Sequence, residues 1–466
     1  MWVEKIRILS GRRAAGNAVI VIASVILVYL LVSLYFMNHF FVNTTVNEVD
    51  VSLKTGEDAD RIMRAYVKNY SLCLMERNGE KEEITGREIG LKYKEENSMK
   101  EILGRQNSLK WIVTFFRVRK LYACDLFTYD EKALENKING LNCLNNNRIR
   151  PENVGFHYSG GSYELVKEVY GNIIRRERLN AVIRTGISRG ETVFDLNETL
   201  CYENPEYTLN SPKTLHTGDL LNKYVSTSIT YVFGSKKETL DGNIIHLWLR
   251  VNDELEVEIN KSSAAEYVRG LGKKYDTVGI ARSFQTSLGK VIEVNGGIYG
   301  WKINQSAETE ALLENISHGL VIFKEPVYTQ TAVSREGNEI GNTYVEINIT
   351  RQHLWFYKDG KLIAHGPVVT GNPGRGNATV VGTYMLNYKQ RDALLTGPGY
   401  AAATKYWMPF YGNIGVHDAS WRYSFGGEIY KRNGTHGCVN APLYLAKVIF
   451  EHISEGIPII CYEEPE

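Results

Sequence analysis

The sequence predicts an α+β chain with an N-terminal transmembrane helix, two α+β domains and a mostly-β C-terminal domain. Three observations predict this order. A 25-residue stretch without an ionisable side chain begins at Ala14, a weak internal repeat spans residues 46–325, and strand-like alternation surrounds an Asp-Gly pair after residue 341. The 466 residues allow several domains, and 43% hydrophobic with 23% charged residues is ordinary globular composition.

The N-terminal apolar stretch predicts a membrane anchor at residues 14–41. Val19 to Phe36 is almost wholly apolar, and at about 1.5 Å per residue it can cross a hydrocarbon core of about 30 Å. Residues 1–13 hold four basic residues against one acidic residue, so we expect a cytoplasmic tail and an extracellular remainder. A cleaved signal peptide is the alternative. Its apolar region is typically about 7 to 15 residues long and is followed by a small-x-small cleavage site, whereas the apolar run here is longer and no such site follows it.

The charge and the cysteines narrow the class of protein further. The net charge is +1, and the basic tail leaves the outer part slightly acidic, which argues against a nucleic-acid partner. Six cysteines are present and no CxxC spacing occurs. If Cys438 must stay free, the other five cannot all pair within one chain. Because most of them have apolar neighbours, we expect reduced core residues.

The repeat predicts two α+β domains, at residues 46–205 and 206–325, followed by a polar linker at 326–340. Short glycine-led segments at Gly90, Gly171 and Gly300 each follow a strand-like run and precede helical spacing. Turns of this kind are also common by chance. Within the repeat we expect helices at 58–74 and 307–316, and strands at 244–251 and 255–259.

The C-terminal domain, residues 341–463, begins with an alternating strand at 344–350. Strands at 354–357 and 362–369 flank Lys358-Asp359-Gly360-Lys361, and Asp-Gly supplies the positive φ angles of a tight hairpin turn. Asn440-Ala441-Pro442 resembles a helix start, with Asn440 as N-cap of an apolar helix from Leu443 to Ile453.

One stretch of this domain carries the candidate chemistry: residues 433–440, Asn-Gly-Thr-His-Gly-Cys-Val-Asn, with His417 twenty-one residues before Cys438. A thiol becomes a nucleophile when an imidazole takes its proton or a helix N-terminus lowers its pKa. Gly434 and Gly437 permit a sharp turn, which predicts that the amides of Gly437 and Cys438 point at an oxyanion.

Other interpretations of these residues stay open. An isolated cysteine is often a core residue. His417, His436 and Cys438 could ligate zinc, although no convincing fourth ligand is found. Thr435 and Asn440 are candidate supporting residues of the site, but Asn440 could be only a helix cap and Thr435 only a turn hydroxyl.

Residues 414–417, 435–440 and 456–460 resemble the signature of the L,D-transpeptidase catalytic domain, the YkuD-like family. The resemblance covers about residues 341–463. It departs at Thr379-Val380-Val381-Gly382, which lacks the proline of the family's Thr-Pro-x-Gly. Residues 161–205 and 290–301 resemble the peptidoglycan-binding domains that often precede such catalytic domains, which implies wall engagement. A purely structural stalk is the alternative.

The resemblance implies a cell-wall enzyme that uses no cofactor. Cys438 would attack a tetrapeptide stem and release D-alanine, with His417 as base, and a neighbouring stem's amine would then take the acyl group. The main-chain carbonyl of Asp418 would orient His417, and His436 would line the site. An L,D-carboxypeptidase that trims stem peptides and a non-catalytic wall-binding scaffold are the alternatives, and the oligomeric state is left open.

A stretch before His417 predicts a substrate lid. Small residues with glycine hinges run from Leu395 to Ala403, and Tyr406, Trp407 and Met408 follow as candidate substrate-binding residues. Core packing of these large side chains is the other interpretation.

Overall fold

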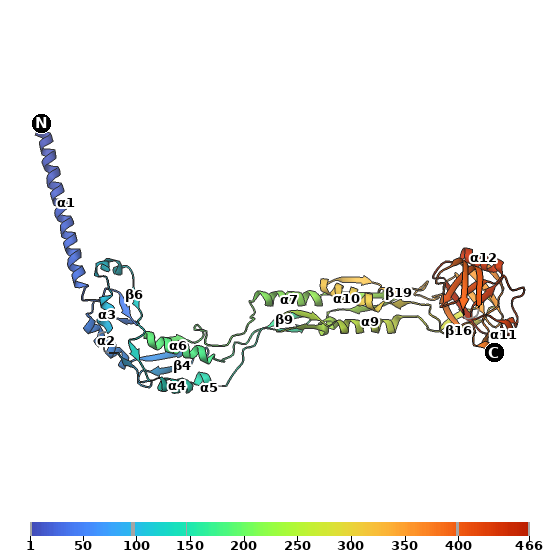
Figure 1. Cartoon of the computed structure of the whole chain (residues 1–466), viewed down its shortest axis with the longest axis horizontal. Helices are drawn as coiled ribbons and strands as arrows, with labels where there is room; N and C mark the ends of the chain where they lie inside the picture. Colours follow the sequence, from blue (N-terminus) through green and yellow to red (C-terminus); the bar gives the residue numbers. More distant parts are fainter. Residues whose placement is uncertain (1, 95–97, 146, 398–399, 465–466) are drawn as a thin grey trace. The chain divides into compact units, whose positions relative to one another are not determined.

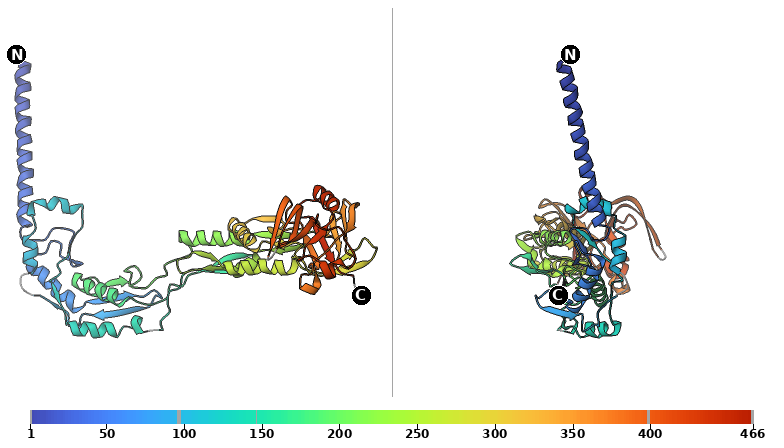
Figure 2. Two further views of the ribbon diagram at one scale, coloured as in Figure 1. Left: turned by 45° about the vertical axis from the view of Figure 1, so that its right-hand side comes forward. Right: turned by 90° about the vertical axis from the view of Figure 1, so that its left-hand side faces the viewer.

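The computed structural model describes residues 2–94, 98–145, 147–397 and 400–464 (Figures 1 and 2). The chain divides into two compact units. The first comprises the chain up to Gly155 together with Leu165–Ser211, and the second comprises Phe156–Glu164 together with the chain from Pro212 onward.

The first unit begins with a long helix, α1 (Trp2–Tyr35), shown in blue in Figure 1. Its segment Gly16–Tyr35 is long and apolar enough to cross a membrane. The 20 residues of that segment give a length of about 30 Å, which matches a hydrocarbon core. The helix therefore agrees with the expected anchor in length and composition.

The rest of the first unit is an α+β module. Helix α2 (Gly56–Lys68) begins at Thr55, whose side chain accepts a hydrogen bond from the Asp58 amide. Strand β10 pairs parallel with β3, and β3 pairs antiparallel with β4. The principal elements after α2 are β3 (Ser71–Met75), β4 (Lys81–Thr85), α6 (Arg176–Arg189) and β10 (Val193–Asp195).

The predicted helix at 58–74 is too long. It ends at Lys68, and Ser71–Met75 is a strand in which Leu72 and Leu74 alternate into the core. These residues form a strand because both edges of β3 pair with neighbouring strands, β10 and β4. The shorter elements of this unit are β1 (Thr44–Val46), β2 (Val49–Asp50), β5 (Lys92–Tyr93), α3 (Ser98–Gly104), η1 (Ser108–Phe115), β6 (Arg119–Leu121), β7 (Phe127–Thr128), α4 (Glu131–Asn139) and α5 (Asn142–Asn145).

The second unit opens with a module of the same order. Helix α7 leads into the hairpin β11–β12, and helix α10 leads into β18, which pairs parallel with β11. This order of helix, two strands, later helix and parallel strand matches that of α2, β3, β4, α6 and β10. The bounds are α7 (Pro212–Val225), β11 (Ser228–Phe233), β12 (Lys236–Leu240), α10 (Gln305–His318) and β18 (Val321–Lys324).

The two modules show which of the three glycine-led segments are equivalent, and this corrects the predicted repeat. Gly171 and Gly300 both precede the helix that leads to the closing parallel strand, α6 and α10 respectively. Gly90 follows β4 instead and lies before the short strand β5, so it has no equivalent role. The helix expected at 307–316 is confirmed as the centre of α10.

The strand expected at 244–251 is largely helical. Asp241 caps a short helix by accepting a hydrogen bond from the Asn243 amide, and only Leu249–Val251 is a strand. Ile245 and Trp248, one helical turn apart, are both buried, which is the spacing of a helix and not of a strand. The remaining elements here are β8 (Gly155–Ser159), β9 (Ser162–Val166), α8 (Gly242–Ile245), η2 (His246–Trp248), β13 (Leu249–Val251), β14 (Val257–Ile259), α9 (Lys261–Tyr275), β15 (Arg282–Gln285), β16 (Val291–Val294) and β17 (Lys302–Ile303).

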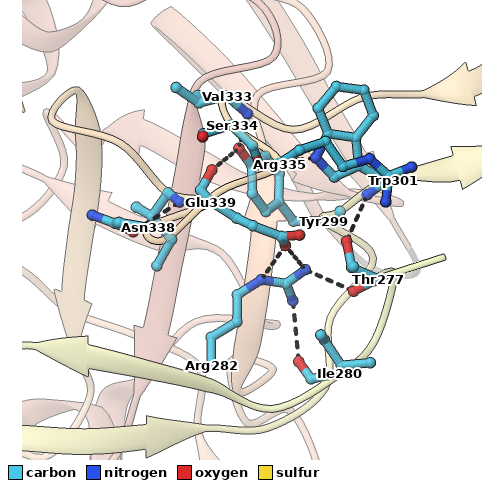
Figure 3. A network of polar contacts seen from close by, with 12 residues as sticks. Thr277, Ile280, Arg282, Tyr299, Trp301, Val333, Ser334, Arg335, Asn338 and Glu339 are labelled. Carbon is cyan, nitrogen blue, oxygen red and sulfur yellow. Dashed lines mark hydrogen bonds and ion pairs between the residues drawn. The ribbon is translucent and has the colours of Figure 1, made fainter. Parts of the chain in front are cut away.

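The polar segment expected as a linker is packed against the chain before it (Figure 3). After strand β19 (Tyr328–Gln330), Glu339 forms a largely buried ion pair with Arg282 at 2.8 Å. Tyr299 donates its hydroxyl hydrogen to the Glu339 carbonyl at 2.8 Å, and the Trp301 indole donates to the Ser334 carbonyl at 2.9 Å. The polar residues of this segment therefore form hydrogen bonds and an ion pair with the preceding chain. The predicted domain bounds stay predictions.

The C-terminal domain contains two sheets that enclose a common core with helix α12. The first has the order β22-β21-β20-β28-β23 and the second the order β24-β25-β26-β27. The predicted hairpin is confirmed, with φ of 50° at Asp359 and 76° at Gly360. The bounds are β20 (Tyr344–Asn348), β21 (His353–Lys358), β22 (Lys361–Pro367), η3 (Pro373–Arg375), β23 (Gly382–Met385), β24 (Gln390–Gly397), β25 (Tyr400–Tyr411), β26 (Ile414–Asp418), α11 (Ile429–Asn433), β27 (Val439–Ala441), α12 (Leu443–His452) and β28 (Pro458–Tyr462).

Candidate active site

The pairing of two strands brings the candidate residues together. Strands β26 and β27 are parallel, with Val416 opposite Val439 and His417 opposite Asn440. Side chains alternate along a strand, so Cys438 and Asn440 lie on the same face as His417. These three line a pocket of about 600 Å³, whose other lining residues are Leu395, Ala401, Ala402, Ala403, Ser420, Trp421, Arg422, Gly434, Thr435 and His436.

The turn before Cys438 is held by three hydrogen bonds. The Thr435 hydroxyl donates to the Cys438 carbonyl at 2.5 Å and accepts from the Gly437 amide at 3.0 Å. The Thr379 hydroxyl donates to the Gly437 carbonyl at 2.7 Å. Gly437 has φ of 120°, a conformation that strains residues with a Cβ atom. The sequence of the turn therefore fixes the position of the cysteine.

The Cys438 thiol is protonated at neutral pH. Its Sγ donates to the Asn413 carbonyl at 3.4 Å. Burial raises the pKa of Cys438 to about 11, and the backbone hydrogen bond with Gly415 opposes that shift only in part. A nucleophilic role for this sulfur therefore requires a base at the moment of attack.

His417 has the environment of such a base. Its Nδ1 lies 2.9 Å from the Asp418 carbonyl, so this nitrogen carries the hydrogen and Nε2 is left as an acceptor. Burial lowers the pKa of His417, which keeps the ring neutral near pH 7. The Asp418 carboxylate faces elsewhere and accepts hydrogen bonds from the Lys405 and Tyr406 amides, both at 2.8 Å. The expected contact with the main chain of Asp418 is present.

Two predicted details of the cysteine's surroundings differ in the structure. Helix α12 starts at Leu443, with Pro442 as its N-cap and the strand Val439–Ala441 before it, so its dipole is too distant to act on Cys438. Of the two predicted oxyanion donors, the Gly437 amide is engaged by Thr435.

Asn440 is not the cap of α12, because it lies in β27. It is buried, and its Oδ1 has no hydrogen-bond partner among the residues that the structure describes. A buried acceptor without a partner costs free energy of about 1–3 kcal/mol. Asn440 therefore presents an unused acceptor on the pocket face of the sheet.

The three predicted substrate-binding side chains are buried away from the pocket wall. Tyr406 and Met408 belong to the core between the sheets, and Trp407 packs against the His417 ring with centroids 5.8 Å apart. None of the three is among the described residues that line the pocket. Tyr406 and Met408 point into the core, whereas Trp407 lies opposite His417 in the pairing of β25 with β26 and so faces the same side of the sheet as His417. Substrate binding by these residues stays a prediction.

The predicted lid residues form the end of a long hairpin, β24–β25, and Leu395 and Ala401 to Ala403 line the pocket. Pro398 and Gly399 lie outside the described residues. A lid motion stays a prediction.

Four residues of the site were not found from the sequence: Thr379, Ser420, Trp421 and Arg422. Trp421 lies beside His417 with ring centroids 6.0 Å apart, and Arg422 donates to the Asn433 carbonyl at 2.8 Å. Burial lowers the pKa of Arg422. The only sequence signal for Ser420, Trp421 and Arg422 was that they closely follow His417, and Thr379 is distant in sequence from both His417 and Cys438.

Among the described residues, His417, His436 and Cys438 do not form a cluster with ligand atoms mutually within 4.8 Å. All six cysteines are unpaired. Cys201 and Cys461 are buried as expected, whereas Cys124 is exposed. The thiol of Cys438 is thus available without competition from a disulfide.

Comparisons with known proteins place this geometry in a family. Residues 342–461 match the model of the L,D-transpeptidase catalytic domain, and residues 82–195 and 215–320 match that of a peptidoglycan binding domain. No curated protein matched the chain.

Two solved structures contain chains that are similar to this one. A cysteine-to-serine variant of the Enterococcus faecium L,D-transpeptidase is 30% identical over 54% of this chain and 100% of that chain, with a TM-score of 0.43. The catalytic domain of an E. faecium L,D-transpeptidase acylated by ertapenem is 34% identical over 27% of this chain and 100% of that chain, with a TM-score of 0.25.

The first of these identities extends over the full length of the solved chain, and the catalytic-domain model matches the same part of this sequence. The two peptidoglycan-binding modules precede that domain. The chain belongs to the L,D-transpeptidase family.

Proposed function

We propose that this chain is a membrane-anchored L,D-transpeptidase in which Cys438 carries the acyl group. The observation that supports this best is the common face of β26 and β27, where His417 and Cys438 line one pocket. Outside the membrane no nucleotide supplies energy, so a new peptide bond must draw on an old one, and a thioester conserves that free energy.

The donor step begins at a neutral thiol and a neutral imidazole. Nε2 of His417 takes the thiol proton as Sγ of Cys438 attacks the carbonyl that precedes the terminal D-alanine of a tetrapeptide stem. The C–N bond to D-alanine breaks, and His417 returns the proton to the leaving amine. A thioester and free D-alanine result.

The acceptor step reverses these roles. The amine of a neighbouring stem attacks the thioester carbonyl, the C–S bond breaks, and a peptide bond forms. His417 takes the surplus proton from the amine and returns it to Sγ of Cys438. Water in place of the amine would give a trimmed stem.

Substrate placement follows from the pocket walls. Oδ1 of Asn440 is an acceptor without a partner among the described residues, which suits an N–H of the donor stem. The Cys438 amide is the first candidate oxyanion donor, and the Gly437 amide joins it if Thr435 releases its hydrogen bond. Thr435 and Asp418 serve as positioning residues, and His436 lines the pocket.

Location follows from the N-terminal part of the chain. The segment Gly16–Tyr35 would cross the cell membrane once, with the basic tail in the cytoplasm and the catalytic domain facing the wall. The two modules that match peptidoglycan-binding models would hold the wall near the active site.

Product analysis tests the proposal. The full chain in detergent is incubated with a disaccharide tetrapeptide, with and without a second stem that offers a free amine. We expect released D-alanine and a cross-linked dimer, both lost in Cys438→Ala and both retained in Cys124→Ala, which removes an exposed thiol. Cross-linking by Cys438→Ala would end the proposal, and trimming alone would make the chain a carboxypeptidase.

A further inference from the structure

A basic and apolar segment follows helix α3. Residues 105–120 contain five basic residues and no acidic residue. The short helix η1 and the residues just after it expose large apolar side chains, whose exposed fractions are 51% for Leu109, 48% for Ile112, 53% for Val113, 53% for Phe115, 85% for Phe116 and 67% for Val118. An apolar cluster of this kind on a soluble surface marks an interaction site.

Helix η1 packs on the last turns of α1, within the first unit. Tyr29, Ser33 and Phe36 lie on one face of α1, and the Tyr29 hydroxyl donates to the Leu109 carbonyl. The Trp111 ring lies 5.7 Å from that of Tyr29 and 6.2 Å from that of Phe36. Figure 2 shows the short cyan helix beside the lower end of α1.

This contact fixes the depth of η1. The candidate span ends at Tyr35, and Tyr29 lies six residues earlier. At about 1.5 Å per residue, Tyr29 is about 9 Å below the outer end of the span. A helix whose backbone bonds to Tyr29 cannot remain in water if the span is in the bilayer.

We propose that residues 105–120 form a second membrane contact, with η1 lying in the outer leaflet beside α1. The inference rests on the membrane anchor of the proposed function. The exposed apolar side chains would insert among acyl chains, and the exposed Arg105, Lys110 and Arg117 would meet headgroup phosphates. The Tyr29 hydroxyl donates a hydrogen bond to the Leu109 carbonyl, which would otherwise lack a partner inside the bilayer.

Lipid is favoured over a protein partner for two reasons. Helix η1 packs on α1 within the candidate span, where Leu27 and Leu31 are exposed, and the charged side chains of residues 105–120 are all positive. Aromatic and basic residues around an apolar helix are typical of membrane interfaces. The first module would therefore be held to the membrane at two points.

Photo-cross-linking in the full chain tests this. A benzophenone amino acid replaces Phe116, and the protein is reconstituted in vesicles of phosphatidylcholine and phosphatidylglycerol. The matched control replaces Phe323, which is 72% exposed in the second unit, and a positive control replaces Leu27, which is 59% exposed within the span. After irradiation, mass spectrometry counts lipid adducts.

We expect lipid adducts at position 116 at least fivefold above those at 323 and comparable with those at 27. If lipid adducts form at position 27 but position 116 gives no more of them than position 323, the second membrane contact is overturned and the anchor is still supported. A cross-link from position 116 to a second copy of the chain in place of lipid would also overturn it. Absence of adducts at both 27 and 116 would contradict the anchor itself.

Discussion

The sulfur of Cys438 starts in its neutral form, because burial raises its pKa to about 11. We therefore expect the rate of iodoacetamide alkylation at Cys438 to keep rising from pH 6 to pH 10, as the thiolate fraction grows. Peptide mass spectrometry at each pH measures this residue separately from the exposed Cys124. A rate that is constant across this range would show a preformed thiolate and imidazolium pair and would contradict the neutral ground state.

The acid limb of acylation reports on His417. Burial lowers the pKa of His417 below the ordinary 6.5, so the imidazole stays neutral until the pH falls below this lowered pKa. Acylation by a defined tetrapeptide stem should hold its rate down to about pH 6.5 and fall as the pH drops further. An acid limb with a midpoint above 6.5 would contradict the assigned environment.

Thr379 gives a test of the turn before the cysteine. In Thr379→Val the Gly371 amide and the Gly437 carbonyl lose a buried partner, which costs about 1–3 kcal/mol for each group. Because the turn sets the position of Cys438, acylation should also slow about 10-fold to 100-fold. Thermal unfolding measures the loss of stability, and the rate of acylation by a defined tetrapeptide stem measures the loss of positioning. The exposed Thr331→Val should change neither, and unchanged acylation in Thr379→Val would contradict the positioning role.

For single residues, the stretch 433–440 and the preceding His417 indicated the thiol and the imidazole, and the family resemblance implied the main-chain contact of Asp418. Thr379 was not predicted as a site residue, and Asn440 was predicted either as a supporting residue of the site or as a helix cap. Thr379 is far from Cys438 in sequence, and Asn440 precedes a proline in a pattern that resembles a helix cap. Only the strand pairing of β26 with β27 shows that Asn440 faces the pocket.

Among the elements, the segment between β18 and β20 carries the clearest energetic test. Glu339→Gln breaks the largely buried pair with Arg282 and leaves a guanidinium without its counter-charge, which costs about 3–5 kcal/mol. Differential scanning calorimetry of the full chain should show a lowered transition for the unit that contains it. The exposed pair of Glu428 with Lys431 is the control, and Glu428→Gln should leave the transition in place. Equal transitions in the two variants would show that the segment is a loose linker.

Local patterns predicted some elements well and others poorly. The Asp-Gly hairpin and helix α10 follow from turn chemistry and from a regular apolar spacing. The strand predicted from Ile244 to Val251 was largely wrong because a short apolar run does not distinguish a buried helical segment from a strand. The internal packing of the segment at 326–340 was not predicted because its partners, Arg282 and Trp301, are distant from it in sequence.

For the whole molecule, the order of anchor, two modules and catalytic domain follows from composition and motifs. The family comparisons bear out the modules and the catalytic domain. The phase of the repeat required the strand pairing, because Gly90 imitates the other two glycine turns. Membrane topology stays a prediction.

Cys124 tests that topology, since it is exposed and lies beyond α1 in the sequence. A membrane-impermeant maleimide added to intact cells should label the wild-type chain at Cys124 and leave Cys124→Ser unlabelled at that position. The reason is that residues after the span are expected outside the membrane. Labelling that appears only after the cells are permeabilised would contradict the topology.

The central claim is that Cys438 holds the acyl group, and intact-protein mass spectrometry tests it most directly. The full chain is mixed with a defined tetrapeptide stem, quenched in acid within seconds and digested. The account predicts a mass increase equal to the stem without its D-alanine, located on the peptide with Cys438 and missing in Cys438→Ala. An adduct on another residue, or cross-linked product from Cys438→Ala, would contradict it.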